Sequence, residues 1–139
     1  MPLAGVQLTI QQALALCYVM GWRRTDLTTA VALMFAESGR YTKAWHDNLR
    51  EDGSVASTDR GLYQINDKAH PALSDEAAYN GVANTMYAFA LWERNGFAPW
   101  AAYNSGAWLK YRREARLARL RYWSWRRLRS TIVETVDGL

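Results

Sequence analysis

The side chain with the clearest capacity for chemistry in this sequence is Glu37. It falls in the last turn of an expected helix, one turn beyond the apolar residues Leu33 and Met34. Burial among apolar neighbours disfavours a carboxylate, and so does the negative end of the helix dipole, so both raise the pKa of this carboxyl group. A carboxyl group that keeps its proton near neutral pH is what a general acid needs. The alternative is a solvated glutamate at a frayed helix end.

Two helices must position this glutamate. Apolar residues at helical spacing predict a first helix over residues 9–20. A second helix is expected to start with Thr25 or Asp26 as its N-cap and to end at Gly39. Glu37 then lies at the C-terminal end of the second helix, where a structural role would favour Lys or Arg.

The middle of the chain changes character. Residues 40–67 lose the helical period and are rich in Gly, Asp, Asn, Ser and Thr, which predicts loops with a short β-hairpin around Gly53. Ser74 is expected to cap a further helix. Residues 77–92 are apolar nearly all round, so this helix is the candidate for a central buried helix.

The C-terminal third predicts two more helices. Pro99 suits the start of a short helix that runs to Tyr103, and a turn follows at residues 104–106. The expected fold class is mainly α, of the mixed α+β kind, with helices around one buried helix and a small loop and hairpin lobe. A long final helix is expected over residues 107–129, with an apolar stripe formed by Tyr111, Ala115, Ala118, Tyr122 and Trp125.

The length and composition of the chain indicate one globular domain. Its 139 residues are half hydrophobic, and a domain of this size can fold without a metal or a disulfide. The single cysteine, Cys17, cannot form an intrachain disulfide and is expected in the core rather than as a nucleophile. The two histidines, His46 and His70, show no His-Glu-x-x-His pattern, so we expect no metal and no cofactor.

Three short motifs follow one another along the chain. They are residues 36–39 (Ala-Glu-Ser-Gly), residues 57–66 (Ser-Thr-Asp-Arg-Gly-Leu-Tyr-Gln-Ile-Asn) and residues 100–106 (Trp-Ala-Ala-Tyr-Asn-Ser-Gly). Together they resemble the lysozyme-like superfamily, which includes soluble lytic transglycosylases, goose-type lysozymes and their phage relatives. The resemblance covers residues 25–109 and implies an enzyme that cleaves the glycan strands of peptidoglycan.

The resemblance also assigns roles by position. It implies that Glu37 protonates the glycosidic oxygen between N-acetylmuramic acid and N-acetylglucosamine, and that Tyr103 reaches towards Glu37 and orients it. Gln64 and Asn66 would line the sugar cleft, with ordinary turn chemistry as the alternative. Core packing is the alternative for Tyr103, and local hydrogen bonding that holds the turn is the alternative for Ser38. The implied substrate-binding residues are Ser38, Gln64, Asn66, Tyr103 and Asn104.

Asp59 bears on the type of reaction. Residues 57–59 also resemble the animal lysozymes, in which this aspartate is a second catalytic carboxylate. Retaining glycosidases hold two carboxyl groups roughly 5 Å apart, and inverting enzymes keep a wider gap for water. The transglycosylase family instead uses one Glu, and the sugar's own 6-hydroxyl attacks. Hydrolysis and lytic transglycosylation therefore both stay open, and Asp59 is either catalytic or an Asx-turn residue. Further possible second carboxylates are Asp47, Glu51 and Asp52.

Two positions depart from the transglycosylase pattern. These are Arg60 and Tyr63, the latter where Met is usual, and they leave the reaction type and the sugar subsites open. Trp45 and Trp100 are candidates for packing on sugar rings, with core packing as the alternative.

Basic residues concentrate at the C-terminal end. The net charge is +4, and nine of the 17 basic residues fall between Lys110 and Arg129. We expect residues 1–109 to form the catalytic domain and residues 110–139 a basic, aromatic C-terminal helix that packs on it or extends it. This segment is either a solvated helix face or a site of adhesion to wall polymer, membrane or a neighbouring virion protein.

Residues 1–10 carry no Lys or Arg, and the apolar stretch 13–20 is too short to span a bilayer. We therefore expect synthesis in the cytoplasm without a signal peptide or transmembrane segment. Action on the cell wall would follow as a virion component or a released lysin. The alternative function is a structural phage tail component that retains a lysozyme-like fold. A nucleic-acid binder ranks last, because it leaves the three motifs unexplained, and no nucleic-acid partner is expected.

Overall fold

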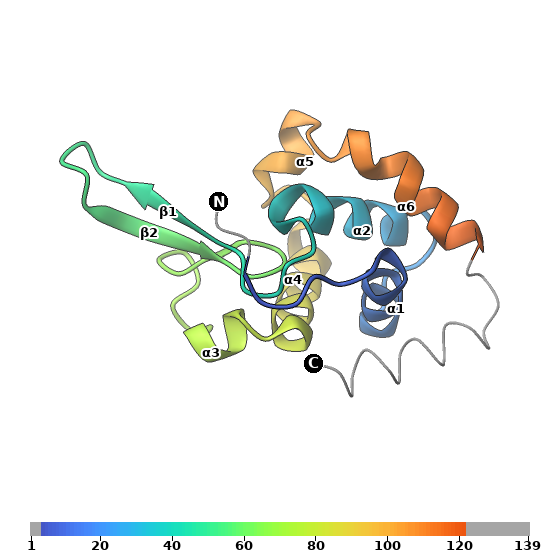
Figure 1. Ribbon diagram of the computed structural model, residues 1–139, viewed down its shortest axis with the longest axis horizontal. Coiled ribbons are helices and arrows are strands. Elements are labelled where there is room, and N and C mark those ends of the chain that lie inside the picture. The colour runs from blue at the N-terminus through green and yellow to red at the C-terminus, as the bar shows by residue number, and fades with distance from the viewer. Residues whose placement is uncertain (1–3, 122–139) are drawn as a thin grey trace.

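A helical lobe and a smaller β-sheet lobe lie side by side in the protein (Figure 1). The computed structural model describes residues 4–121. The predicted fold class, mainly α with a small β lobe, is confirmed. In chain order the elements are α1 (Ile10–Met20), α2 (Arg24–Ser38), β1 (Trp45–Leu49), β2 (Val55–Arg60), β3 (Ile65–Asn66), α3 (Asp75–Ala78), α4 (Gly81–Asn95), α5 (Ala101–Ser105) and α6 (Leu109–Arg121).

The helix predicted over residues 9–20 is confirmed as α1, and its N-terminus shows why it begins there. Thr9 is the N-cap: its hydroxyl accepts a hydrogen bond from the N–H of Gln12 at 3.1 Å, and the Gln12 side chain accepts one from the N–H of Thr9 at 2.9 Å. This reciprocal capping box satisfies two N–H groups that the helix leaves without partners.

The N-cap predicted for α2 is wrong, whereas its predicted end is confirmed. The helix begins at Arg24 after Arg23, without a capping hydrogen bond from a side chain, so Thr25 and Asp26 lie inside its first turn. Asp26 still suits that turn because the helix dipole favours an acid there. Gly39 ends the helix with a left-handed φ of 60°, and its N–H donates to the carbonyl of Phe35 at 2.8 Å.

The hairpin predicted around Gly53 is confirmed and belongs to a larger sheet. β1 pairs antiparallel with β2, and β2 pairs antiparallel with β3, in the order β1-β2-β3. The register places Asp59 of β2 between His46 of β1 and Asn66 of β3. Side chains on neighbouring strands at one register position lie close together, so the sheet places a polar residue from each of the two neighbouring strands beside Asp59.

The predicted cap at Ser74 is confirmed, because its side chain accepts a hydrogen bond from the N–H of Ala77. The single helix predicted to follow it through residues 77–92 is wrong, because two helices occupy this stretch. α3 ends at Ala78, and Asn80 then caps α4 by accepting a hydrogen bond from the N–H of Ala83 at 2.9 Å. The prediction that this segment is the central buried helix also fails, since Met86 of α4 is 57% exposed. The central helix is α2, which packs against α1, α5 and α6.

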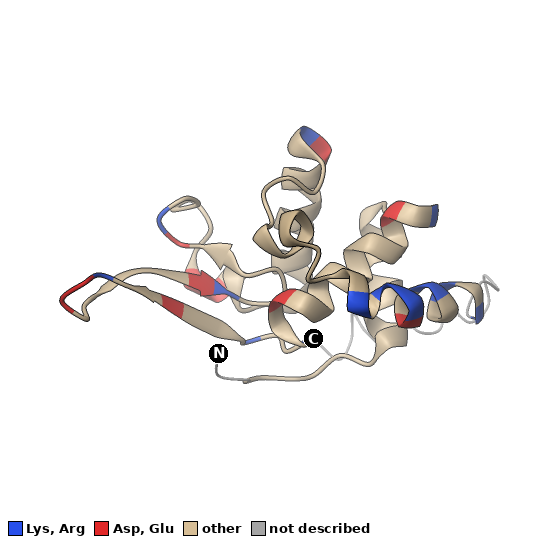
Figure 2. Ribbon diagram, turned by 90° about the horizontal axis from the view of Figure 1, so that it is seen from above, with Lys and Arg blue, Asp and Glu red and all other residues tan. Residues whose placement is uncertain are grey.

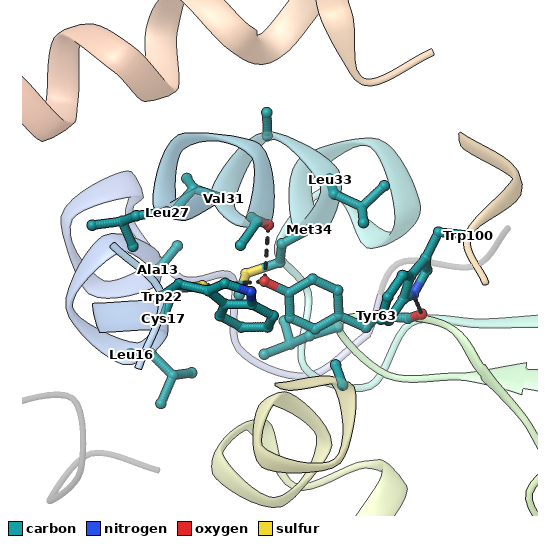
Figure 3. Packing of buried hydrophobic residues seen from close by; sticks show 14 of the residues in the cluster. Ala13, Leu16, Cys17, Trp22, Leu27, Val31, Leu33, Met34, Tyr63 and Trp100 are labelled. Carbon is teal, nitrogen blue, oxygen red and sulfur yellow. Dashed lines mark hydrogen bonds between the residues drawn. The ribbon is translucent and has the colours of Figure 1, made fainter. Parts of the chain in front are cut away.

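The core lies between α1, α2 and α4, and Tyr63 stands near its centre (Figure 3). The Tyr63 hydroxyl donates a hydrogen bond to the carbonyl of Ala30 at 2.8 Å and lies 3.1 Å from the sulfur of Cys17. Cys17 is fully buried, as predicted, and burial raises the pKa of its thiol to about 12. Such a thiol is a packing group and not a nucleophile.

The short helix expected after Pro99 is α5, which also includes residues 104 and 105 that had been assigned to a turn. In α6 the buried residues Ala115 and Ala118 confirm the predicted stripe within the described residues, and the helix packs against α1 and α2. Residues 122–129 of the predicted final helix, and Tyr122 and Trp125 with them, lie outside the described residues. The domain boundary at residue 109 stays a prediction. Within residues 4–121 no helix is long and apolar enough to cross a membrane.

Candidate active site

Glu37 lies in the last turn of α2, and the residue after it fixes the geometry of that turn. Ser38 is buried, and its hydroxyl donates to the carbonyl of Met34 at 3.0 Å while it accepts from the N–H of Arg40 at 3.2 Å. Met34 lies one turn before Ser38, and Arg40 is the second residue after the end of α2, so this one hydroxyl links the last turn of the helix to the segment that follows it. Ser38 therefore holds the turn, as in the alternative considered for it, and its assignment to the substrate-binding set is corrected.

The carboxyl group of Glu37 has an unusual affinity for its proton. Burial raises its pKa from 4.5 to about 7. A hydrogen bond from the backbone N–H of Ala102 acts in the opposite direction, and the negative charge of Asp59 raises the pKa further. The direction agrees with the prediction from the sequence, and at this pKa the group can both donate and accept a proton near neutral pH.

Glu37 and Asp59 line the same cleft, which has a volume of about 240 Å³. Its walls come from the end of α2, from β2 and β3, from the loop after β3, from α4 and from the start of α5. Its polar lining comes from Glu37, Asp59, Gln64, Asn66 and His70. Its apolar lining comes from Ile65, Ala69, Leu91, Pro99, Trp100 and Ala101. A site with an apolar wall and a few convergent polar groups suits a ligand such as a sugar, which has apolar faces and polar edges.

The carboxylate of Asp59 is held by two side-chain amides. One oxygen accepts a hydrogen bond from Asn66 at 2.8 Å and the other from Asn48 at 3.1 Å. Both amides also donate to the hydroxyl of Ser57, at 3.0 and 3.1 Å. The partners come from neighbouring strands, so the Asx-turn alternative for Asp59 is wrong. The network fixes the orientation of the carboxylate in the cleft.

Gln64 and Asn66 both line the cleft, and their side chains also order the loops around it. Gln64 has a left-handed φ of 50°, and its amide donates to the carbonyls of Ala44 and Gly61 at 3.0 and 2.9 Å. The side-chain oxygen of Asn66 accepts from the N–H groups of the second and third residues after it, at 3.0 Å each. Both residues therefore line the cleft, as predicted, and both also form the turn hydrogen bonds that were considered as the alternative.

Tyr103 and Asn104 lie away from the cleft lining, which corrects their predicted positions. The ring of Tyr103 stacks on Trp108 with 5.5 Å between ring centroids, and the side chain of Asn104 donates to the carbonyl of Ala98 at 2.9 Å. The predicted contact to Glu37 comes instead from the backbone N–H of Ala102. Successive side chains on a helix point about 100° apart. Because the first turn of α5 presents the N–H of Ala102 to Glu37, the side chain of Tyr103 points in another direction.

The other acidic residues considered as a second carboxylate lie in the β1–β2 hairpin and outside the cleft lining. Asp47 accepts a hydrogen bond from the hydroxyl of Thr58 at 2.7 Å. Asp52 accepts from the N–H and hydroxyl of Ser54 in the turn, and these hydrogen bonds lower its pKa. Glu51 is exposed beside it. Asp59 is therefore the second carboxylate of the cleft, and within residues 4–121 no cluster of His, Cys, Asp and Glu could hold a metal ion.

His70 is a cleft residue that the sequence did not reveal. Its Nδ1 lies 3.0 Å from the hydroxyl of Tyr87 on α4, and the two rings meet edge to face. Burial and the nearby charge of Arg60 lower its pKa, which favours the neutral imidazole. Its position depends on a contact 17 residues along the chain, so local spacing gave no signal for it.

The aromatic candidates divide between cleft and surface. Trp100 lines the cleft with part of its ring, yet it is only 5% exposed, and its indole N–H donates to the carbonyl of Tyr63 at 3.0 Å. It is thus a core residue with one edge in the site. Trp45 is 37% exposed on β1 and lies outside the cleft lining.

The two departures from the transglycosylase pattern are structural residues. Tyr63 fills the core. The guanidinium of Arg60 is buried and donates to the carbonyls of Ile65 and Leu73, at 3.2 and 2.9 Å, and to the carboxylate of Asp75 at 2.9 Å. Arg60 thereby ties down both ends of the loop that supplies Ala69 and His70 to the cleft.

Together, a two-lobed α+β fold and a cleft with a protonatable glutamate beside a fixed aspartate define a lysozyme-like class of protein. A family model described as a lysozyme-like domain matches residues 14–102, more than half of the chain. The chain belongs to this lysozyme-like domain family, and membership indicates a peptidoglycan-cleaving activity in general terms. No curated protein and no solved structure matches the chain significantly.

Proposed function

We propose that this protein cleaves the β-1,4 bond between N-acetylmuramic acid and N-acetylglucosamine in peptidoglycan, with Glu37 as the catalytic acid and then base. The observation that carries the proposal is one cleft in which Glu37, with a pKa raised to about 7, lies with the anchored carboxylate of Asp59. Most glycosidases use two carboxyl groups in different surroundings, one that keeps its proton and one that stays ionised.

In the first step Glu37 donates its proton to the glycosidic oxygen while the bond to the anomeric carbon breaks. Positive charge develops on the sugar ring, and the carboxylate of Asp59 stabilises it. Asn48 and Asn66 hold that carboxylate in place, so it need not reorganise during the reaction. The N–H of Ala102 steadies the Glu37 carboxylate once the proton has left.

In the second step Glu37 acts as a base and takes a proton from the nucleophile as it attacks the anomeric carbon. We propose that water attacks, so that the enzyme is a hydrolase. A second carboxylate held in the cleft supports hydrolysis, because lytic transglycosylases use one Glu and the 6-hydroxyl of the substrate. Water as the nucleophile releases a reducing muramic acid end, whereas attack by the 6-hydroxyl releases a 1,6-anhydro end.

Digestion of purified sacculi followed by mass analysis of the soluble fragments tests both parts of this proposal. Reducing fragments are expected from the wild type. Fragments lighter by one water would show that the site is a lytic transglycosylase. The absence of any soluble fragment from folded protein would favour the alternative of a structural virion component. Glu37→Gln is the matched control, because it keeps the shape of the side chain and removes its proton chemistry.

We further propose that the protein reaches the wall as a virion component or as a released lysin. The resemblance of its three motifs to phage relatives of the family supports this route. Detection of the chain in purified virions, set against its detection only in lysates, would distinguish the two forms of delivery.

A further inference from the structure

One face of α6 is turned away from the protein and has an unusual composition. Ala115 and Ala118 pack on the core, while Leu109, Leu117 and Leu120 on the opposite side are 51%, 56% and 54% exposed. At 100° per residue these three leucines fall on one stripe of the helix. Together with Arg112, Arg113 and Arg116 they line a shallow groove, and we call these six residues the outer face of α6.

The outer face carries charge of one sign. Arg112, Arg113 and Arg116 are exposed, and within residues 4–121 none of them forms an ion pair with an acidic side chain. Figure 2 shows Lys and Arg predominating along α6. The acid of this helix, Glu114, is not among the outer-face residues and interacts electrostatically with Arg40 instead. In the described part of the chain, residues 4–121, no hydrogen bond or ion pair involves these arginine side chains, and the three leucines are not part of the hydrophobic core.

We propose that the outer face of α6 binds the surface of an anionic lipid bilayer. The helix lies flat, its leucines enter the boundary between headgroups and acyl chains, and its arginines contact lipid phosphates. The long arginine side chains reach the phosphates while the leucines go deeper. No outer-face residue lines the catalytic cleft, so the proposed lipid contacts and the proposed catalytic groups are different residues.

Other binding partners would contact either the arginines or the leucines of this face favourably, but not both. A water-soluble polyanion, such as a wall polymer or a nucleic acid, would pair with Arg113 and Arg116 but leave the leucines in water. A second copy of the chain would cover the leucines but bring like charges together. An anionic bilayer offers phosphate and hydrocarbon at adjacent depths, which matches the interleaved order of arginine and leucine.

The first test reports where the leucines go. In Leu120→Cys an environment-sensitive dye can be attached selectively, because Cys17 is fully buried and its thiol pKa is about 12. Vesicles of phosphatidylglycerol mixed with phosphatidylcholine are expected to shift the dye emission to the blue, while vesicles of phosphatidylcholine alone leave it unchanged. The same dye at Leu49→Cys, on the exposed β1 strand (63% exposed), should show no shift.

The second test measures how much each half of the face contributes to vesicle affinity of the full chain. The pair Arg113→Gln and Arg116→Gln should weaken binding to the mixed vesicles about 25-fold, since each basic residue near such a surface contributes about fivefold. The pair Leu117→Ser and Leu120→Ser should weaken it by about tenfold or more. Leu49→Ser and Arg94→Gln, matched exposed controls on other elements, should bind like the wild type.

Several outcomes would overturn the proposal. One is failure of the wild type to bind the mixed vesicles, or equal binding to neutral ones. Another is binding that depends on the arginines but not on the leucines, since this would indicate recognition of charge alone. Self-association that the leucine pair abolishes would identify a second copy as the occupant. Digestion of sacculi by the same variants is expected to stay unchanged, which separates this proposal from the proposed catalytic function.

Discussion

The carboxylate of Asp59 accepts a hydrogen bond from the side-chain amide of Asn66 at 2.8 Å, and the two residues are direct partners across the β2–β3 ladder. Asn66 in turn lies at the start of a loop that its own side-chain oxygen holds through two backbone N–H groups. The orientation of the second carboxylate is therefore tied to the conformation of the loop that forms one wall of the cleft.

Asn66→Ala should lower kcat about ten- to a hundredfold, because a hydrogen bond to a charged group is worth about 1.5–3 kcal/mol and its loss leaves the Asp59 carboxylate with only the amide of Asn48 to hold it. KM for soluble glycan fragments should rise as well, because Asn66 lines the cleft and holds its loop, whereas the overall fold, followed by circular dichroism, should change little. Asn95→Ala, at an exposed helix end, is the matched control. A variant with wild-type kcat would show that this contact does not serve catalysis.

The pH dependence of kcat/KM should carry the signature of Glu37. Because the protonated group is the acid, activity should fall as pH rises through about 7. The charge of Asp59 raises the pKa of Glu37 after the larger effect of burial. The residual activity of Asp59→Asn should therefore decline at a lower pH than that of the wild type. Glu93→Gln, with the same charge change at an exposed site on α4, should leave the profile in place; an equal displacement in both variants would contradict the assignment.

Protein stability should also depend on the proton of Glu37. The folded protein holds this proton up to about pH 7, whereas the unfolded chain loses it near 4.5. The stabilisation linked to the proton is thus complete below pH 4.5 and is lost as pH rises to about 7. Glu37→Gln, which cannot ionise, should be more stable than the wild type at pH 8, by up to about 3 kcal/mol, and the difference should shrink towards pH 5. Urea unfolding at both pH values measures it, and a difference independent of pH would speak against the raised pKa.

Arg60 and its acidic partner should contribute very unequally to stability. Arg60→Ala leaves buried carbonyls of the cleft loop without donors and should lower the free energy of unfolding by about 2–4 kcal/mol. Asp75→Asn should lower it by less than about 1 kcal/mol, because the Asp75 side chain is 80% exposed and its ion pair is weakened by solvent. Chemical denaturation of the two variants compares them, and equal losses would assign the stabilisation to the ion pair instead.

Local signals in the sequence predicted the start of α1 and the end of α2 correctly. Thr9 and Gly39 set boundaries through hydrogen bonds within a few residues, and such contacts follow from residue type and spacing. The break between α3 and α4 was missed because the apolar residues on its two sides were assigned to one helix, although Asn80-Gly81 between them is a dipeptide typical of a turn. There the side chain of Asn80 caps a new helix. The buried side-chain amide of Asn84 donates hydrogen bonds to the carbonyls of Arg60 and Ala78.

The sequence also predicted only part of the candidate site, because local signals reveal residue types but not contacts between distant segments. Glu37 and Asp59 stand out by residue type within motifs, and the fold brings both to one cleft. Tyr103 was misplaced because its direction depends on the angle at which α5 approaches α2. His70 was missed because its position depends on Tyr87, far along the chain. Tertiary contacts decide both, and neither leaves a periodic pattern in the sequence.

The proton affinity of Glu37 is the physical basis of the proposed chemistry, and it can be measured on the side chain itself. A titration of the Glu37 carboxyl carbon by nuclear magnetic resonance, with Glu37→Gln to assign the signal, follows that one group from pH 3 to pH 9. A midpoint near 7 is expected from its burial in the cleft. A midpoint near 4.5, the value of an ordinary glutamate, would contradict its role as the catalytic acid.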